Sequence, residues 1–338
     1  MIVLAIETSC DETACAVIQD GRKILSNIVS SQAELFEKYG GVVPEIASRK
    51  HMEYMIPVVE QALADAKIKL ADIDAVAVTK GPGLVGALLA GISLAKGIAI
   101  AADIPLIGVN HLEGHIAANY LVNPELKPPF LCLLVSGGHS HILKVNDYTE
   151  IEVLGRTRDD ASGEAFDKVA RAMGLGYPGG PKVDAAAKNG DPLKYSFPRT
   201  RFKDNPYDFS FSGLKTAVLN TINNIKQKGG NPDVDNLCAS FQHTVAMTLT
   251  DNIILAARET GYKTIVAAGG VAANSGLRQL LAHASSECGC SIYFPPLSLC
   301  TDNAAMIGAA AYYHLIKGES DDYSLNAVPS LKIGVNPV

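Results

Sequence analysis

Short apolar runs alternate with stretches of helical periodicity along this chain, and the alternation occurs twice in the same order. Strands are predicted where a short apolar run stands between turn residues, and helices where apolar residues recur every three or four positions. In the first half these patterns predict strands at 2–6, 14–18, 75–78 and 106–109, and helices at 45–66 and 84–102.

The second half repeats this layout without a close residue-by-residue repeat. Its predicted strands lie at 130–135, 142–145, 264–268 and 291–294, and its predicted helices at 164–173, 214–226, 236–260, 272–285 and 304–316. Alternating helices and strands are typical of parallel sheets, which bind ligands at the carboxyl ends of their strands. The sequence therefore predicts a bilobal α/β fold with its active site in the cleft between the lobes.

The predicted division places the N-terminal lobe at 1–128 and the C-terminal lobe at 129–325, followed by a tail at 326–338. An irregular insertion of basic and aromatic residues is expected at about 191–212. An alternative placement packs the last long helix, within about 301–318, on the N-terminal lobe. A chain of 338 residues is long enough for two cores of this size.

Composition narrows the class of protein. The net charge of −6 lacks the basicity of a dedicated nucleic-acid-binding chain, so contact with RNA would need a local patch or a partner. Seven scattered cysteines in apolar surroundings favour reduced thiols and a cytoplasmic protein. No basic leader precedes the first strand, and the apolar stretch 84–102 contains Lys96, which favours a buried helix over a membrane span.

Two histidines follow the strand predicted at 106–109. His111 and His115 are four residues apart, so on a helix both imidazoles lie on one face within reach of a single cation. Two nitrogens make an incomplete metal site, and a pair of surface histidines is the simpler interpretation of the spacing alone. The His-Glu-x-x-His arrangement of metalloproteases is absent, because Glu113 does not adjoin His111.

Three loops follow predicted strands, at 8–13, 135–140 and 267–274. Gly137-Gly138 and Gly269-Gly270 can adopt positive φ and let backbone N–H groups approach a phosphate. Neither a Walker motif nor a Rossmann fingerprint is present. The loops indicate a nucleotide site, although hairpins and close packing also explain Gly-Gly pairs.

Together these segments resemble one family, the bacterial tRNA N6-adenosine threonylcarbamoyltransferases, formerly described as O-sialoglycoprotein endopeptidases. The resemblance spans nearly the whole chain and is carried by motifs at 7–13, 80–83, 111–115, 135–139, 159–168, 179–181, 211–215 and 268–274. It implies the duplicated actin/Hsp70/hexokinase-like (ASKHA) fold, in agreement with the repeated layout.

The resemblance implies one divalent metal per subunit, Fe²⁺ in the first place and Zn²⁺ as the alternative. Its ligands would be His111, His115 and Asp302, a set that leaves coordination positions open for substrate oxygens. On the residues alone, Asp302 is better explained as the N-cap of the last helix.

The implied substrate is threonylcarbamoyl-AMP, from which the threonylcarbamoyl group moves to N6 of the adenosine 3′ of the anticodon in tRNAs that read codons starting with A. AMP is released. By resemblance the adenylate would contact Leu134, Val135, Ser136, Gly137, Gly138, Asp167, Gly180, Asp184 and Asn274. Asp167 and Asp184 suit ribose hydroxyls, while solvated charge on a helix is their simpler explanation.

An aromatic amine is a poor nucleophile, so the reaction requires a base and stabilisation of the developing oxyanion. Asp11 is the candidate base, with Glu12 as the alternative, and the metal and the amides of Gly137 and Gly138 could stabilise charge. The two acids could equally shape their turn.

The family resemblance also implies partners: tRNA, an inactive paralogue of the same fold that dimerises with this chain, and a small P-loop ATPase. Lys194, Arg199, Arg201 and Lys203 among aromatic residues suit an RNA backbone, or a solvated insertion. Two other functions stay open, a small-molecule kinase of the same fold and a nucleotide-binding scaffold without turnover. A complete metal set argues against both.

Overall fold

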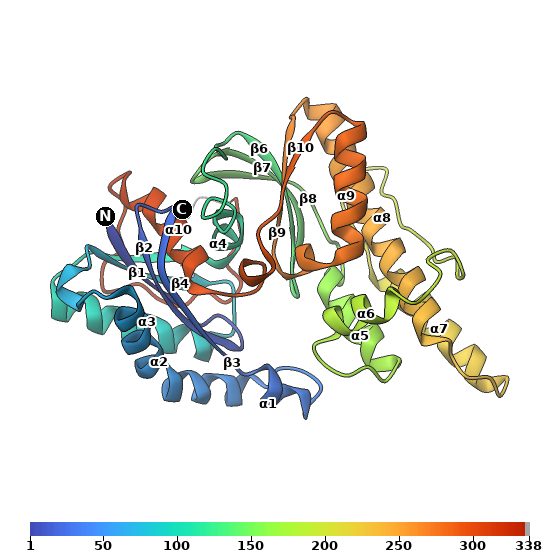
Figure 1. Ribbon diagram of the computed structural model, residues 1–338, viewed down its shortest axis with the longest axis horizontal. Helices are drawn as coiled ribbons and strands as arrows, with labels where there is room; N and C mark the ends of the chain where they lie inside the picture. The colour runs from blue at the N-terminus through green and yellow to red at the C-terminus, as the bar shows by residue number, and fades with distance from the viewer. Residues whose placement is uncertain (335–338) are drawn as a thin grey trace. The chain divides into compact units, whose positions relative to one another are not determined.

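The computed structural model describes residues 1–334, and the chain forms two compact units. Unit 1 comprises Met1–Pro128, Asn146–Glu152 and the chain from Pro295 onward, and unit 2 comprises Pro129–Val145 and Val153–Phe294. Figure 1 shows the course of the chain through both units. Within the described residues each unit has one five-stranded sheet.

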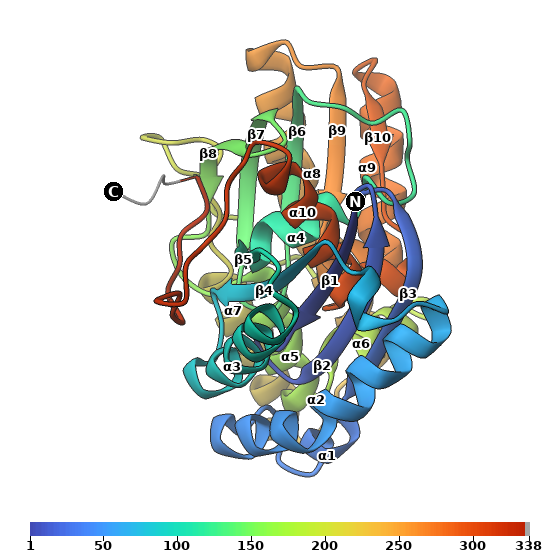
Figure 2. The same ribbon diagram turned by 90° about the vertical axis from the view of Figure 1, so that its left-hand side faces the viewer.

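Unit 1 is built on a mixed sheet of strand order β3-β2-β1-β4-β5. The strands are β1 (Ile2–Glu7), β2 (Glu12–Gln19), β3 (Lys23–Ser31), β4 (Ala75–Gly81) and β5 (Leu106–Asn110). β1 pairs antiparallel with β2 and parallel with β4, and β4 pairs parallel with β5. The carboxyl ends of β1, β4 and β5 therefore meet at one edge of this sheet (Figure 2).

Helices cover both faces of the unit 1 sheet. Alternate residues of β1 point to opposite faces: Leu4 and Ile6 join the core that includes Leu88 and Ile92, whereas Ala5 lies against Gly308. The helices of unit 1 are α1 (Ala33–Glu37), α2 (Pro44–Ala66), α3 (Val85–Ala102), α4 (His111–Ala117) and α10 (Ala304–Leu315), with the 3₁₀ turns η1 (Leu70–Asp72) and η3 (Leu297–Leu299).

Unit 2 repeats the same plan with the strand order β10-β9-β6-β7-β8. Its strands are β6 (Phe130–Val135), β7 (Ser140–Asp147), β8 (Glu150–Arg156), β9 (Thr264–Ala268) and β10 (Ser291–Tyr293). β6 pairs antiparallel with β7 and parallel with β9, as β1 does with β2 and β4. The duplicated mixed α/β architecture predicted from the sequence is confirmed.

The helices of unit 2 are α5 (Ser162–Ala172), α6 (Gly179–Ala187), α7 (Ser212–Gln227), α8 (Val234–Thr260) and α9 (Ser275–Glu287), with the 3₁₀ turn η2 (Gly270–Ala273). They pack around a core that contains Leu131, Phe166, Phe241 and Ile265. The segment between α6 and α7 has no helix or long strand, as expected for the irregular insertion.

The chain from Pro295 to residue 325 lies in unit 1. The sequence assigned this segment to a C-terminal lobe of 129–325, with the helix within about 301–318 as the part that could return to the N-terminal lobe. The physical reason is the packing of α10 on the unit 1 sheet, where Gly308 admits Ile18 and Ala5 against its backbone. Of the tail expected at 326–338, residues 335–338 lie outside the described residues. Earlier in the tail, Val328 donates its N–H to Lys80 O (2.8 Å).

Within residues 1–334, α3 is the one helix that is long and apolar enough to cross a membrane by length and composition. Leu88, Ile92 and Ala95 of this helix are buried in the core of unit 1. Val85, Leu89 and other apolar residues on the opposite side are exposed. α3 thus serves as a core helix with an apolar outer side.

Candidate metal centre and nucleotide site

The two histidines stand at the carboxyl end of β5. Asn110 is the N-cap of α4, and its Oδ1 accepts a hydrogen bond from the backbone N–H of Leu112 (2.9 Å). His111 and His115 then lie one helical turn apart with ring centroids separated by 4.7 Å. Both imidazoles are buried, so the interpretation as a pair of surface histidines is wrong.

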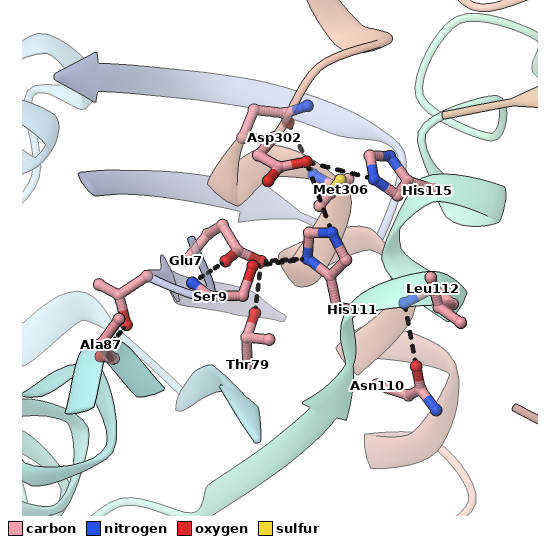
Figure 3. A network of polar contacts seen from close by, with 12 residues as sticks. Glu7, Ser9, Thr79, Ala87, Asn110, His111, Leu112, His115, Asp302 and Met306 are labelled. Atoms are coloured by element: carbon pink, nitrogen blue, oxygen red, sulfur yellow. Dashed lines mark hydrogen bonds and ion pairs between the residues drawn. The ribbon is translucent and has the colours of Figure 1, made fainter. Parts of the chain in front are cut away.

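Asp302 completes a group of three candidate ligands (Figure 3). Its Oδ1 lies 3.2 Å from Nε2 of His115 and 3.4 Å from Nε2 of His111. Asp302 is not the N-cap of α10, because Asn303 occupies that position and accepts the N–H of Met306. The carboxylate of Asp302 therefore faces the two imidazoles.

The arrangement fits a single metal ion. Nitrogen and oxygen ligands at about 2.0–2.2 Å from one ion lie roughly 3.0–3.4 Å apart, which matches the two separations above. Neither ring nitrogen of the buried His115 makes a hydrogen bond within residues 1–334, although Nε2 is close to Asp302. A buried nitrogen that faces a carboxylate without hydrogen-bond geometry is suited to donate its lone pair to a shared cation.

The charges at this site depend on one another. Burial alone would lower the pKa of His111, but the carboxylates of Asp302 and Glu7 hold it well above its ordinary value. Burial alone would raise the pKa of Asp302, yet His111 and His115 hold it well below its ordinary range. The carboxylate is therefore ionised, as a metal ligand must be.

The loop that carries Asp11 and Glu12 is held in place by its backbone. Three successive carbonyls each accept a hydrogen bond from a different part of unit 1. The pairs are Ser9 O with Leu84 N–H (2.8 Å), Cys10 O with His51 Nε2 (2.9 Å) and Asp11 O with Gln32 N–H (3.0 Å). Burial raises the pKa of the Cys10 thiol, which supports packing as the role of that residue.

Glu12, the first residue of β2, has a strongly shifted pKa. Burial, together with the neighbouring charges of Asp11 and Asp302, raises the pKa of Glu12 to about 9. Its Oε1 accepts a hydrogen bond from the hydroxyl of Ser31 (3.0 Å). A carboxyl with this pKa is protonated at neutral pH and cannot accept a proton, which favours Asp11 over Glu12 as a base.

In unit 2, the loop after β6 is approached closely by two glycines. A Cβ on Gly269 would lie 2.4 Å from Val135 O, and one on Gly163 would lie 2.6 Å from Ser136 O. Gly269 adopts a φ of +88°, whereas Gly137 and Gly138 do not adopt the positive φ that the sequence allowed. Gly137 and Gly138 are exposed, with open space where a Cβ would stand.

The other predicted adenylate contacts already have structural partners. Asp167 Oδ1 accepts the N–H of Gly179 (2.7 Å) at the start of α6, where Gly180 follows with open space above it. Asn274 is the N-cap of α9 and also donates its Nδ2 to Gln242 Oε1 (2.7 Å).

These partners limit what each residue can offer a ligand. The side chain of Asn274 is engaged on both its oxygen and its nitrogen, and its backbone N–H and C=O are bonded to Val271 and Arg278. Leu134 and Val135 are fully buried within the sheet, so neither side chain is open to a ligand.

A cavity of about 520 Å³ lies beside these residues, between α6, α8 and α9. Its lining includes Gln242 and Ser275, which are bonded to Asn274 and Asp184 respectively. The structure therefore places Asp184, Asn274 and a cavity of ligand size next to one another in unit 2.

Part of the basic insertion is paired within the chain. Arg199 and Arg201 both pair with Asp251, at 2.6 and 3.4 Å. Tyr195, Phe197 and Tyr207 pack against the core of unit 2. The aromatic residues of the insertion are therefore packed, whereas Lys194, Arg201 and Lys203 are exposed.

Solved structures share the fold of this chain. The nucleotide- and phosphate-bound form of full-length HypF matches with a TM-score of 0.63 and 16% identity, covering 94% of this chain and 47% of that one. Component A of the (R)-2-hydroxyglutaryl-CoA dehydratase of Acidaminococcus fermentans matches with a TM-score of 0.55 and 19% identity, covering 94% and 98%. The chain therefore has the ASKHA fold, and it carries a candidate metal centre.

Sequence comparison then identifies the family. A family model described as tRNA N6-adenosine threonylcarbamoyltransferase matches residues 23–309. Proteins of that name from Clostridioides difficile (strain 630) and Clostridium botulinum (strain 657) are 55% and 56% identical to this chain, with 98% of both chains covered in each case. The chain belongs to the tRNA N6-adenosine threonylcarbamoyltransferase family and is an acyltransferase that modifies tRNA.

Proposed function

We propose that this enzyme transfers the threonylcarbamoyl group of threonylcarbamoyl-AMP to N6 of the adenosine 3′ of the anticodon, in tRNAs that read codons starting with A. The observation that carries the proposal is the convergence of His111, His115 and Asp302 on one point. A non-catalytic scaffold has no use for a metal with open coordination positions, and a kinase has no role for this pair of histidines.

The metal proposed for this site is Fe²⁺, with Zn²⁺ as the alternative. Two histidines and one carboxylate are the ligand set of many non-haem Fe²⁺ enzymes, and Zn²⁺ accepts the same donors. When bound, the ion supplies a Lewis acid that stabilises negative charge on substrate oxygens. His111, His115 and Asp302 would hold it.

Unit 2 would bind the adenylate. Gly137 and Gly138 are exposed, and their backbone N–H groups are suited to donate hydrogen bonds to phosphate oxygens. The open space above Gly180 lets a nucleoside approach the backbone. Asp184 would accept hydrogen bonds from ribose hydroxyls. Asp167, with Oδ1 bonded to Gly179, would support the start of α6 and add a second carboxylate near the ribose.

Asp11 would remove the proton from N6 of adenosine as this nitrogen attacks the carbamoyl carbon. The carbamoyl–phosphate bond then breaks and AMP leaves. Asp11 is suited to this role because its loop is fixed by the three carbonyl hydrogen bonds described above. The protonated carboxyl of Glu12 would instead donate a hydrogen bond.

Binding of tRNA would require further proteins, because the net charge is −6 and Asp251 neutralises two arginines of the insertion. We infer a cytoplasmic assembly with an inactive paralogue of the same fold and a small P-loop ATPase.

The proposed docking surface for the paralogue is the apolar outer side of α2 and α3. Ser48 of α2 touches Gly86 of α3, since a Cβ on Gly86 would lie 2.5 Å from Ser48 Oγ. Around this contact the two helices expose Met52, Ile56, Val85, Leu89 and, further along α3, Ile100. Met52 and Val85 are 65% and 55% exposed. Clustered exposed apolar residues mark interaction sites.

The test is a reconstituted reaction with labelled threonine, bicarbonate, ATP, an adenylate-forming enzyme and tRNA, with and without the candidate partners. We expect label in tRNAs that read codons starting with A and none in tRNAs of other codon classes. If label never reaches RNA in any combination, the transferase proposal fails. Transfer of the γ-phosphate of ATP to a small molecule would instead support the kinase.

A further inference from the structure

A buried carboxylate stands directly behind one of the two metal-binding histidines. Glu7, the last residue of β1, is 0% exposed, and its Oε2 lies 2.9 Å from Nδ1 of His111 (Figure 3). The two residues meet because the carboxyl ends of β1 and β5 share one edge of the unit 1 sheet. Neither the motifs nor the spacing of the sequence assigned a role to Glu7.

The carboxylate of Glu7 is held on both of its oxygens. Thr79 donates its hydroxyl to Oε2 (2.6 Å), and Ser9 donates its backbone N–H to Oε1 (2.5 Å). The side chain can neither rotate nor turn away from His111 without losing a buried hydrogen bond. Glu7 therefore forms a fixed support for the imidazole.

The hydrogen bond to Glu7 selects one tautomer of His111. A carboxylate accepts hydrogen bonds, so Nδ1 of His111 must carry the proton when the ring is neutral. The lone pair then lies on Nε2, which faces Oδ1 of Asp302 at 3.4 Å. His115 has no such support, because its Nδ1 has no hydrogen-bond partner within residues 1–334. The two histidines are thus chemically unequal.

The charges also match a divalent ion. A histidine that binds a metal is neutral, so in the loaded site the carboxylates of Glu7 and Asp302 would be two uncompensated negative charges in a buried region. Buried charges are tolerated when they are paired, and a cation of charge +2 would compensate both carboxylates.

We propose that Glu7 is a positioning residue of the metal centre, which orients His111 through Nδ1 and supplies the second negative charge that suits a divalent cation. The inference rests on the proposed metal site and not on the transfer reaction. Carboxylates behind ligand histidines commonly change metal affinity by 10–100-fold.

The test is the metal affinity of purified Glu7→Gln, measured by competition between the protein and a chromophoric chelator for Zn²⁺. Gln keeps the volume of Glu7 and removes its charge. We expect affinity to fall by about 10–100-fold, and the visible spectrum of the Co²⁺-loaded protein to shift because His111 is oriented differently. The matched control is Glu113→Gln, which removes a carboxylate from α4 that is bonded to His314 instead.

An affinity within twofold of the parent, or an equal loss in Glu113→Gln, would overturn the role of Glu7. If Glu7→Gln does not fold, Thr79→Val removes one hydrogen bond from the carboxylate and should weaken Zn²⁺ binding several-fold; unchanged binding there would also overturn it. If the parent protein binds no Zn²⁺, or if His115→Ala binds Zn²⁺ as tightly as the parent does, the metal site itself is refuted along with the inference. These outcomes are separable from the transfer assay.

Discussion

Ser275 donates both its backbone N–H (3.1 Å) and its hydroxyl (2.7 Å) to the same carboxylate oxygen, Oδ1 of Asp184. The contact ties the middle of α6 to the first residue of α9. It fixes the position of a carboxylate that we assign to the ribose of the adenylate.

Replacing Ser275 with Ala should therefore weaken AMP binding about 2–10-fold, the effect of one hydrogen bond of about 0.5–1.5 kcal/mol. Isothermal titration with AMP measures the change. Ser286→Ala, at the far end of α9, is the control and should bind AMP as the parent does. Equal affinity for AMP in the parent and both variants would contradict the assignment of Asp184 to the nucleotide site.

Removal of the metal should destabilise the folded protein only when its ligands are intact. A ligand that binds the folded state alone raises stability by about RT ln(1 + [L]/Kd). A strong chelator should lower the melting temperature of the parent by several degrees and leave His115→Ala unchanged. His283→Ala, an exposed histidine of α9, should respond as the parent does. The same response in His115→Ala would place the metal elsewhere.

Asp11→Asn should reduce the single-turnover rate about 10²–10⁴-fold, the usual contribution of a general base. Binding of AMP and of metal should stay at the parent level, because neither site uses the charge of Asp11. Glu12→Gln should cost much less, since a carboxyl with a pKa of about 9 is already protonated at pH 7. A larger loss of rate in Glu12→Gln than in Asp11→Asn would instead assign the base to Glu12.

His141 should make unit 2 less stable in mild acid. Burial and the nearby charge of Arg156 lower the pKa of His141 to about 4, against about 6.5 in an unfolded chain. Between pH 4 and pH 6.5 the unfolded state binds more protons at this histidine than the folded state does. The free energy of unfolding is therefore at its full value above pH 6.5 and decreases as the pH falls towards 4. The loss is about 3 kcal/mol at most.

Urea unfolding at several pH values measures this dependence. His141→Phe should flatten the curve between pH 6.5 and 4, because Phe cannot be protonated. His283→Gln, an exposed control, should keep the parent's slope. An unchanged slope in His141→Phe would assign the pH dependence to other groups.

Met52→Asp and Leu89→Asp should each prevent co-purification of the paralogue, since a charge in the middle of an apolar contact is costly to bury. Leu193→Asp is the matched control, because Leu193 is an exposed leucine of unit 2. Binding of AMP should survive in all three variants. Undiminished co-purification of both α2 and α3 variants would require another docking surface.

The strands that bury both faces were the most predictable elements. The runs at 130–135 and 264–268 coincide with β6 and β9, because every residue of β6 and nearly every one of β9 is buried. β8 was missed, since it is half-exposed and carries charged residues at alternate positions. α6 entered the prediction only as the alternative explanation of Asp184, because it begins with Gly179-Gly180-Pro181, a sequence typical of a bend.

The candidate site was predictable only in part. The spacing of His111 and His115 suggested a shared cation, but the spacing alone could not place them inside the protein. Asp302 entered by resemblance, because its own sequence context is that of a helix cap. Glu7 was missed, since only the pairing of β1, β4 and β5 brings it to His111. A glutamate at the end of a fully apolar strand was the available signal.

The position of Asp302 along the chain has a consequence for biosynthesis. Both histidines precede unit 2, whereas Asp302 follows it. A nascent polypeptide leaving the ribosome therefore exposes two ligands long before the third, and it completes the set only after all of unit 2 has been translated. A metal ion captured earlier would be held by imidazoles alone, so tight loading must wait until Asp302 has been translated.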